Sequence, residues 1–93
     1  MSYHILLADL ARRDFEQLDG SVRQRIHKRL LELADSPNGL GTKSLRGGLR
    51  DYRSLRVGDW RVCYFVDEDA HAVRIVAIRH RREIYEDLKR RLL

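Results

Sequence analysis

The chain has 93 residues, of which 43% are hydrophobic and 35% are charged. This length is enough for one domain with a modest core and excludes two separately folded domains. The formal net charge is +5, from 19 Lys and Arg against 14 Asp and Glu. We therefore expect one globular domain with a highly charged surface.

The excess positive charge lies in the second half of the chain. Residues 1–42 carry six basic and six acidic side chains, whereas residues 43–93 carry 13 basic and eight acidic ones. Most of these basic residues are arginines, whose planar guanidinium binds phosphate oxygens two at a time. The composition favours a nucleic-acid partner, with a solvated basic surface as the alternative.

The chain contains one cysteine, Cys63, within a predicted strand, so an intramolecular disulfide and a zinc cluster built on thiolates are excluded. We expect an ordinary buried thiol. The N-terminal apolar run at residues 5–8 is too short for a signal or membrane segment. The expectation is a cytoplasmic protein with no membrane partner.

The first half predicts a strand followed by a helical hairpin. Residues 3–8 are an apolar run typical of a buried strand. Apolar residues at helical spacing then predict two helices, with stripes at Ala11, Phe15 and Leu18 and at Val22, Ile26, Leu30 and Leu33. Asp9 and Ser21 are the expected N-caps, and the turn residues at 36–39 end the hairpin.

The second half predicts three strands and a last helix. The glycine-rich segment 39–48 is expected to be a loop, and residues 52–64 read as a β-hairpin. A third strand at 73–78 follows an acidic turn at 67–69, and a helix spans about 83–93. The order β-α-α-β-β-β-α predicts an α+β fold: a small antiparallel sheet with an N-terminal helical hairpin and a C-terminal helix. We expect the helices on one face and the other face open for binding.

The predicted hairpin sets arginine against arginine. With Gly58 and Asp59 as its turn, Arg56 pairs with Arg61 on one face, while Trp60 and Tyr64 lie on the other and are expected in the core. Like charges placed directly opposite destabilise a sheet. A bound polyanion would account for this pair.

The histidines show no metal-ligand spacing, so we expect no metal and no small-molecule cofactor. His4, His27 and His71 are expected at the surface or at strand edges. His80 follows the last strand within a basic run. It is either a plain turn residue or a functional one that acts as a catalytic base or contacts RNA. RNA can be cut without a metal, because the ribose 2′-OH attacks its own phosphate once a base removes the proton.

Several side chains are candidates for the remaining steps. Arg56, Arg61 and Arg81 can stabilise the charge that develops on the phosphate. Tyr85 can stack on a base or donate a proton, or it can be a half-buried residue that anchors the last helix. We expect four arginines of this region to bind RNA: Arg46, Arg50, Arg53 and Arg56.

Three motifs resemble the RelE/ParE superfamily of bacterial toxins, in the same order and at similar spacings. They are Leu-Arg-Gly-Gly-Leu at 45–49, the hairpin at 52–62 and His-Arg-Arg-Glu-Ile-Tyr at 80–85. The similarity extends over essentially the whole chain. It implies a single RelE-like toxin domain over residues 1–93, and a metal-free endoribonuclease that cleaves mRNA in the ribosomal A site.

The resemblance also implies roles for four residues. Arg61 matches the arginine thought to stabilise the transition state, and Arg81 matches a second phosphate-contacting arginine. Tyr85 matches the tyrosine near the scissile nucleotide, and His80 is similar to the acid or base of some relatives. The best-studied branch has two lysines on the first hairpin strand, where this chain has Arg-Ser-Leu-Arg at 53–56. Arginine is a poor general base, which leaves His80 as the candidate.

The implied partners are a cognate antitoxin, the ribosome and mRNA. Such an antitoxin folds around its toxin, and apolar surface on the helices is the expected docking site. The main alternative is a non-enzymatic ParE-like toxin that poisons DNA gyrase, and another is a nucleic-acid-binding module without activity. The joint presence of Arg61, His80, Arg81 and Tyr85 favours RNA cleavage.

Overall fold

The computed structural model describes residues 2–93. Its elements, in chain order, are β1 (His4–Leu7), α1 (Asp9–Glu16), α2 (Gly20–Asp35), β2 (Thr42–Ser44), the short 3₁₀ helix η1 (Gly47–Leu49), β3 (Arg53–Val57), β4 (Trp60–Asp67), β5 (Ala72–His80) and α3 (Ile84–Leu92). The predicted α+β class and the order of the main elements are confirmed. None of the helices within residues 2–93 is long and apolar enough to cross a membrane.

The sheet is mixed, which corrects the expectation of a purely antiparallel one. Its strand order is β1-β5-β4-β3-β2, and β1 runs parallel to β5 while the other pairs are antiparallel. A parallel pair needs a long crossover, and the segment that contains α1 and α2 provides it. The segment predicted as a loop at 39–48 contains β2 and η1. Three residues are too few for a strand period to be visible in the sequence.

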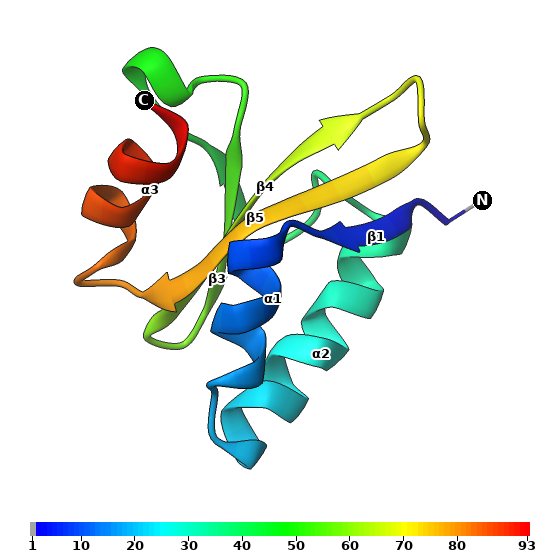
Figure 1. Ribbon diagram of the computed structural model, residues 1–93. Helices are drawn as coiled ribbons and strands as arrows, with labels where there is room; N and C mark the ends of the chain where they lie inside the picture. Colours follow the sequence, from blue (N-terminus) through cyan, green and yellow to red (C-terminus); the bar gives the residue numbers. More distant parts are fainter. Residues whose placement is uncertain (1) are drawn as a thin grey trace.

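Helices cover both faces of the sheet, so the prediction of an open face is wrong. The helices α1 and α2 pack on one face, and α3 lies on the other (Figure 1). On the α1/α2 face, Ile26 of α2 belongs to the same cluster as Val62 and Tyr64 of β4. On the α3 face, Leu88 belongs to a second cluster with Cys63. The second face is covered because β4 carries apolar side chains at successive positions, which point to opposite faces.

The helices begin earlier than predicted. Asp9 is the first residue of α1 rather than its cap, because Ala8 holds the N-cap position without a side-chain hydrogen bond. The N-cap of α2 is Asp19, whose carboxylate accepts a hydrogen bond from the backbone N–H of Ser21 at 3.2 Å. An acid at each of these positions is favourable next to the positive end of the helix dipole.

The predicted hairpin is confirmed in its register. Arg56 pairs with Arg61, and Gly58 occupies the turn with a φ of 59°. Tyr64 is fully buried, and its hydroxyl donates to the backbone carbonyl of Pro37 at 2.5 Å. Trp60 is partly buried against the same core, so both aromatic predictions hold.

The strand β5 contains a bulge and an open edge. Cys63 pairs with Ala77 and Tyr64 with Ile75, so Val76 is an extra residue in β5. The edge opens because β1 ends opposite Ile75.

Two charged side chains occupy that open edge. The carboxylate of Asp14 in α1 accepts the backbone N–H of Ile78 at 2.9 Å. The guanidinium of Arg91 in α3 donates to the carbonyl of Val76 at 3.0 Å. Backbone groups that lack a neighbouring strand are therefore satisfied by side chains from two helices.

Candidate functional site

The turn of the β3–β4 hairpin holds two arginines. The Nη1 of Arg61 donates to the carbonyls of Gly58 and Trp60, at 2.9 Å each. The backbone N–H of Arg81 donates to the carbonyl of Asp59 at 2.8 Å, and its Nε lies 3.7 Å from the Asp59 carboxylate. One tight turn thus brings together two arginines that are 20 positions apart in the sequence.

A row of three arginines crosses the sheet on the face that α3 covers. The register aligns Arg56 with Arg61, and Arg61 with Arg79. Arg79 is neutralised by carboxylates of α3 and the segment before it, with its Nε 2.5 Å from Asp87. Within residues 2–93, neither Arg56 nor Arg61 forms an ion pair with a carboxylate. These two cations therefore remain available to an anion from outside.

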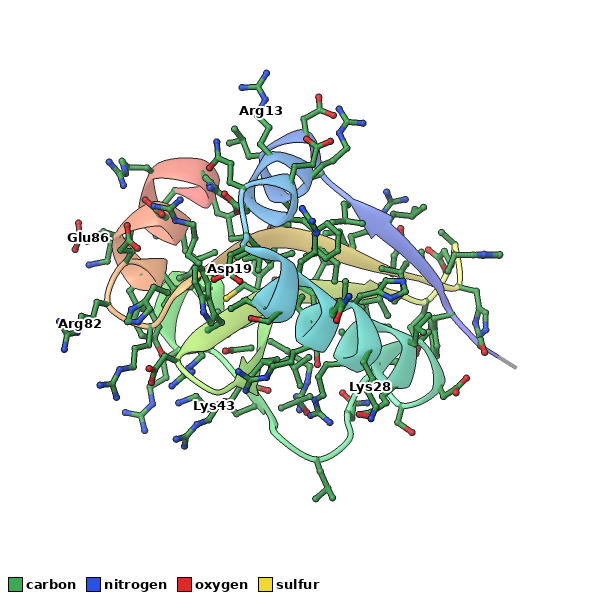
Figure 2. All side chains as sticks on the ribbon, turned by 90° about the horizontal axis from the view of Figure 1, so that it is seen from below. Arg13, Asp19, Lys28, Lys43, Arg82 and Glu86 are labelled. Carbon is green, nitrogen blue, oxygen red and sulfur yellow. The ribbon has the colours of Figure 1, made fainter. Side chains whose placement is uncertain are left out.

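A basic groove of about 470 Å³ lies between β2, η1 and α3. It is lined by Lys43, Ser44, Leu45, Arg46, Leu49, Tyr85 and Lys89. Tyr85 and Lys89 share one side of α3 because they are four residues apart. Tyr85 is half exposed, with 50% of its surface accessible to solvent. In Figure 2, Lys43 and Arg82 lie on the same side of the molecule, with further nitrogen-tipped side chains between them.

Lys43 projects on the same face of the sheet as Arg56 and Arg61. It is paired with Ser54 in the β2–β3 register, and Ser54 and Arg56 are two residues apart on β3. Residues two apart on a strand share a face. The groove and the arginine row therefore lie on one side of the sheet.

Cys63 is buried on the α3 face of the sheet, and its thiol is unreactive. Burial raises the pKa of the Cys63 thiol to about 12, against the opposing effects of a hydrogen bond with Ser54 and the charges of Arg61 and Arg91. Only a thiolate is an effective nucleophile. The predicted ordinary buried thiol is confirmed.

His80 lies apart from Arg61. It pairs with Trp60 in the β4–β5 register, and the two rings meet edge to face at 5.7 Å. Trp60 and Arg61 are consecutive on β4, so their side chains point to opposite faces. The Nδ1 of His80 accepts the backbone N–H of Arg82 at 3.3 Å.

The predicted RNA-binding arginines occupy different surroundings. Arg46 lines the basic groove, and Arg50 is exposed just after η1. Arg56 is exposed in the arginine row. Arg53 instead joins two strands, because it donates to Thr42 Oγ1 at 2.8 Å and to Ser44 Oγ at 2.9 Å.

Lys43 and Lys89 are groove residues that were not predicted from the sequence. The spacing of Tyr85 and Lys89 was a usable signal, because residues four apart lie on one side of a helix. Lys43 gave no such signal, since β2 is too short to be recognised. Its position depends on a pairing between strands that only the fold reveals.

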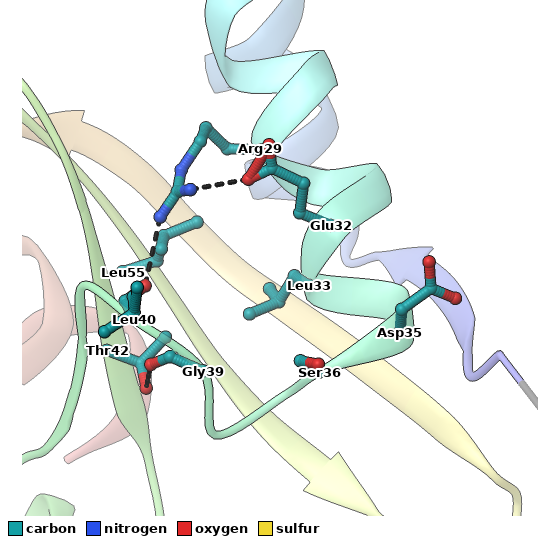
Figure 3. A pocket seen from close by; sticks show the side chains of 9 residues that line it. All are labelled: Arg29, Glu32, Leu33, Asp35, Ser36, Gly39, Leu40, Thr42 and Leu55. Carbon is teal, nitrogen blue, oxygen red and sulfur yellow. Dashed lines mark hydrogen bonds and ion pairs between the residues drawn. The ribbon is translucent and has the colours of Figure 1, made fainter.

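A second hollow, of about 510 Å³, lies between α2 and the loop that leads to β2 (Figure 3). Its polar groups are paired with one another. Arg29 bonds to Glu32 and to the carbonyl of Leu40, and Thr42 Oγ1 donates to the carbonyl of Gly39 at 2.8 Å. These contacts fasten the loop to α2. Over the described range 2–93, there is no group of three or more His, Cys, Asp or Glu side chains placed to hold a metal ion.

Comparisons with known proteins agree with this architecture. A model of the "ParE toxin of type II toxin-antitoxin system, parDE" family matches residues 5–85. Toxin RelE of Mycobacterium tuberculosis (strain ATCC 25618 / H37Rv) is 33% identical over 84 residues, which cover 89% of this chain and 86% of that protein. The mRNA interferase toxin RelE of Escherichia coli (strain K12) is 28% identical over 96 aligned positions, which cover both chains fully.

Solved structures show the same fold. The toxin–antitoxin complex RelBE2 from Mycobacterium tuberculosis contains a chain that superposes with a TM-score of 0.79 at 26% identity, covering 86% of this chain and 99% of that one. A mutant of E. coli toxin RelE in the free state gives a TM-score of 0.79 at 24% identity, with full coverage of both chains. The family model and the relatives agree on one assignment: this chain belongs to the ParE toxin family of type II toxin–antitoxin systems, within the RelE/ParE superfamily.

Proposed function

We propose that the chain is a metal-free endoribonuclease that cleaves mRNA in the ribosomal A site and so inhibits translation in the cytoplasm. The observation that carries this proposal is the placement of Arg61 and Arg81 on one hairpin turn, with Arg56 beside them. Two relatives, from Escherichia coli and Shigella flexneri, are named mRNA interferases. Both span this chain fully at 28% identity.

The proposed reaction is attack of the ribose 2′-oxygen on the adjacent phosphorus, which expels the 5′-oxygen of the next nucleotide. Negative charge develops on the phosphate oxygens in the transition state. Arg61 and Arg81 stabilise this charge, and their anchorage at the turn means that little reorganisation is needed. Arg46, Arg50 and Arg56 bind the RNA backbone, and Arg53 supports them by fixing β2 against β3.

Tyr85 is proposed to stack on a base next to the scissile phosphate. Its ring is half exposed at the edge of the basic groove, on the same side of the sheet as Arg61. Stacking of a base on an exposed aromatic ring contributes about 1–3 kcal/mol. The ring thereby helps to hold the nucleotide in the conformation that in-line attack requires.

His80 remains in the proposal as a positioning residue rather than as the base. Its ring contacts Trp60 and its Nδ1 is occupied by the Arg82 N–H. Both contacts fix the chain just before Arg81. A supporting role in placing Arg81 is therefore more consistent with the geometry than direct proton transfer.

The test is a reconstituted translation reaction in which mRNA 3′ ends are mapped with and without ribosomes. We expect cuts within A-site codons that require ribosomes and disappear with Arg61→Ala. The matched control is Arg13→Ala, an exposed arginine of α1 on a remote part of the surface (Figure 2). Retained cleavage in Arg61→Ala would count against the proposed role of the arginine pair.

Gyrase poisoning is the competing activity, since the matching family model is named for ParE toxins. Intact mRNA together with growth inhibition and an early DNA-damage response would support it. The experiment is induction of the toxin, with translation rate and DNA damage followed over the same minutes. We expect loss of translation to come first.

We further propose that a cognate antitoxin binds this toxin. Structures of relatives include RelB–RelE complexes. A shallow apolar hollow of about 220 Å³ lies between β1, α1 and α2 and is lined by Ile5, Leu7, Phe15, His27, Leu30 and Leu31. Leu31 is 58% exposed there. Leu31→Glu should weaken binding of the antitoxin without affecting mRNA cleavage, as measured by calorimetry and the cleavage assay.

A further inference from the structure

The proposed reaction needs a group that accepts the 2′-OH proton, and the residues on the α3 face of the sheet limit the choice. Arginine stays protonated in proteins, so Arg56, Arg61 and Arg81 are excluded as bases. His80 pairs with Trp60, so its side chain points to the face of the sheet opposite that of Arg61. Three side chains that line the basic groove can accept a proton when they are deprotonated: Lys43, Tyr85 and Lys89.

Lys43 is the best placed of the three. It sits on β2, held in the sheet by its pairing with Ser54, so its backbone position is fixed. Two strand spacings and one pleat repeat separate its Cα from that of Arg61, a distance of about 12 Å. Lysine and arginine side chains each extend about half of this distance. A phosphodiester between them can therefore touch both ends.

Lys43 is also free of competing partners. In the part of the chain that the structure describes, its ammonium has neither a hydrogen bond nor an ion pair. Lys89 differs, because its Nζ lies 3.9 Å from a carboxylate oxygen of Glu86 on an exposed part of α3. Tyr85 is better accounted for by stacking, as proposed above.

We propose that Lys43 is the general base of this ribonuclease, an assignment that rests on the proposed function. The neutral amine of Lys43 takes the proton from the ribose 2′-OH as the 2′-oxygen forms its bond to phosphorus. The bond from phosphorus to the 5′-oxygen breaks, and the leaving oxygen takes a proton from solvent water. The products are a 2′,3′-cyclic phosphate and a 5′-hydroxyl, and the protonated amine returns its proton to solvent.

The surroundings of Lys43 are dominated by positive charge. Ser54 and Arg56 face it from β3, Arg46 from the segment before η1, and Tyr85 and Lys89 from α3. The acid near this group is Glu86, next to Lys89. This positive charge draws the phosphodiester of a bound RNA towards Lys43.

The first experiment measures single-turnover cleavage of ribosome-bound mRNA by Lys43→Arg and Lys43→Ala. Both should lose roughly 100-fold or more in the rate of cleavage, because neither arginine nor alanine can accept a proton. Lys43→Arg should keep its affinity for the ribosome, because arginine keeps the positive charge. The matched control is Lys28→Arg, at an exposed lysine of α2 on the other side of the sheet, which should cleave at the normal rate. Normal cleavage by Lys43→Arg would overturn the proposal and leave Lys43 as a phosphate contact.

The second experiment uses mRNA with sulfur in place of the 5′-oxygen at the cleaved bond. This better leaving group needs no proton, so it restores activity to enzymes that lack a general acid. The Lys43→Ala defect should persist, because the missing step is removal of the 2′-OH proton. Restored cleavage would overturn the assignment as base.

The two proposals can fail separately. Lys43 is exposed on a three-residue strand, so its variants are expected to fold, which thermal melting will verify. If the wild type cleaves and Arg61→Ala does not, the proposed function stands whatever Lys43→Arg does. If the wild type does not cut ribosome-bound mRNA, the proposed function and the role of Lys43 are both overturned.

Discussion

Asp14 in α1 and Arg91 in α3 meet across the open edge of β5. Two hydrogen bonds join them, from Arg91 Nη1 and Nη2 to the two carboxylate oxygens, at 2.8 and 3.0 Å. The Asp14 side chain is 5% exposed and that of Arg91 15%. The hydrogen bond from Arg91 to Asp14 raises the pKa of the guanidinium, although burial opposes it. This pair connects helices that pack on opposite faces of the sheet.

Asp14→Ala should lower the free energy of unfolding by about 3 kcal/mol, because it leaves the Arg91 charge without its partner and removes the acceptor for the Ile78 N–H. Urea denaturation measures this. Asp9→Ala is the control, since the Asp9 side chain is 87% exposed, and it should change stability by less than about 0.5 kcal/mol. Equal effects of the two variants would contradict a structural role for the pair.

The free energy of unfolding should fall in acid because the Asp87 carboxylate becomes protonated. Burial raises the pKa of Asp87, but the hydrogen bond from Arg90 and the charges of Arg79, Arg90 and Arg91 outweigh it, and the net shift is downward. A lowered folded pKa means that the stabilisation is fully present above the ordinary value of about 3.9 and is lost as the pH falls through the folded pKa.

Asp87→Asn tests this linkage. The variant should be less stable than the wild type at pH 6. The difference should shrink as the pH falls below about 4, where the carboxylate of the unfolded chain takes up a proton, until the folded carboxylate is protonated too. Thermal melting between pH 2 and pH 7 gives the comparison. A difference that stays constant down to pH 2 would show that the charge of Asp87 does not contribute.

Tyr85 offers a clean separation between stacking and proton transfer. Tyr85→Phe keeps the ring and should retain at least about a third of the cleavage rate, whereas Tyr85→Ala should lose roughly tenfold or more. Single-turnover kinetics on ribosome-bound mRNA provide the measurement. A severe defect in Tyr85→Phe would instead assign the hydroxyl to the chemistry.

His80→Gln should reduce cleavage by less than about tenfold, since an indirect effect on Arg81 costs less than loss of a direct proton-transfer group. The same assay, repeated across pH, separates the two roles, because a positioning residue changes the rate without changing the shape of the pH profile. A changed profile would make His80 a direct participant.

The sequence predicted the local features of the fold well. The hairpin turn at Gly58 and the Arg56–Arg61 pairing followed from alternation and turn chemistry, and both are confirmed. The covering of the second face of the sheet by α3 was not predicted. Its signal was the presence of apolar residues at successive strand positions, such as Val62 and Cys63, which point to opposite faces. The parallel pairing of β1 with β5 depends on contacts between residues about 70 positions apart, which no local pattern encodes.

The candidate site was predictable only in part. The proposed roles of Arg61, Arg81 and Tyr85 follow from residue types in motifs. Which face each side chain occupies required the register, and that register separates His80 from Arg61 and brings Lys43 towards it. Residue type is written in the sequence, whereas convergence of side chains from β2, β4 and α3 arises only on folding.

Binding of an anion between the opposed residues Arg56 and Arg61 should slow unfolding and degradation of the toxin. In the free protein the two cations repel each other, and any anion that settles between them relieves the repulsion and stabilises the folded state by mass action. An acidic inhibitor segment laid on this surface would therefore silence the toxin and also protect it from unfolding and proteolysis. Release would give a more active molecule that is also shorter-lived.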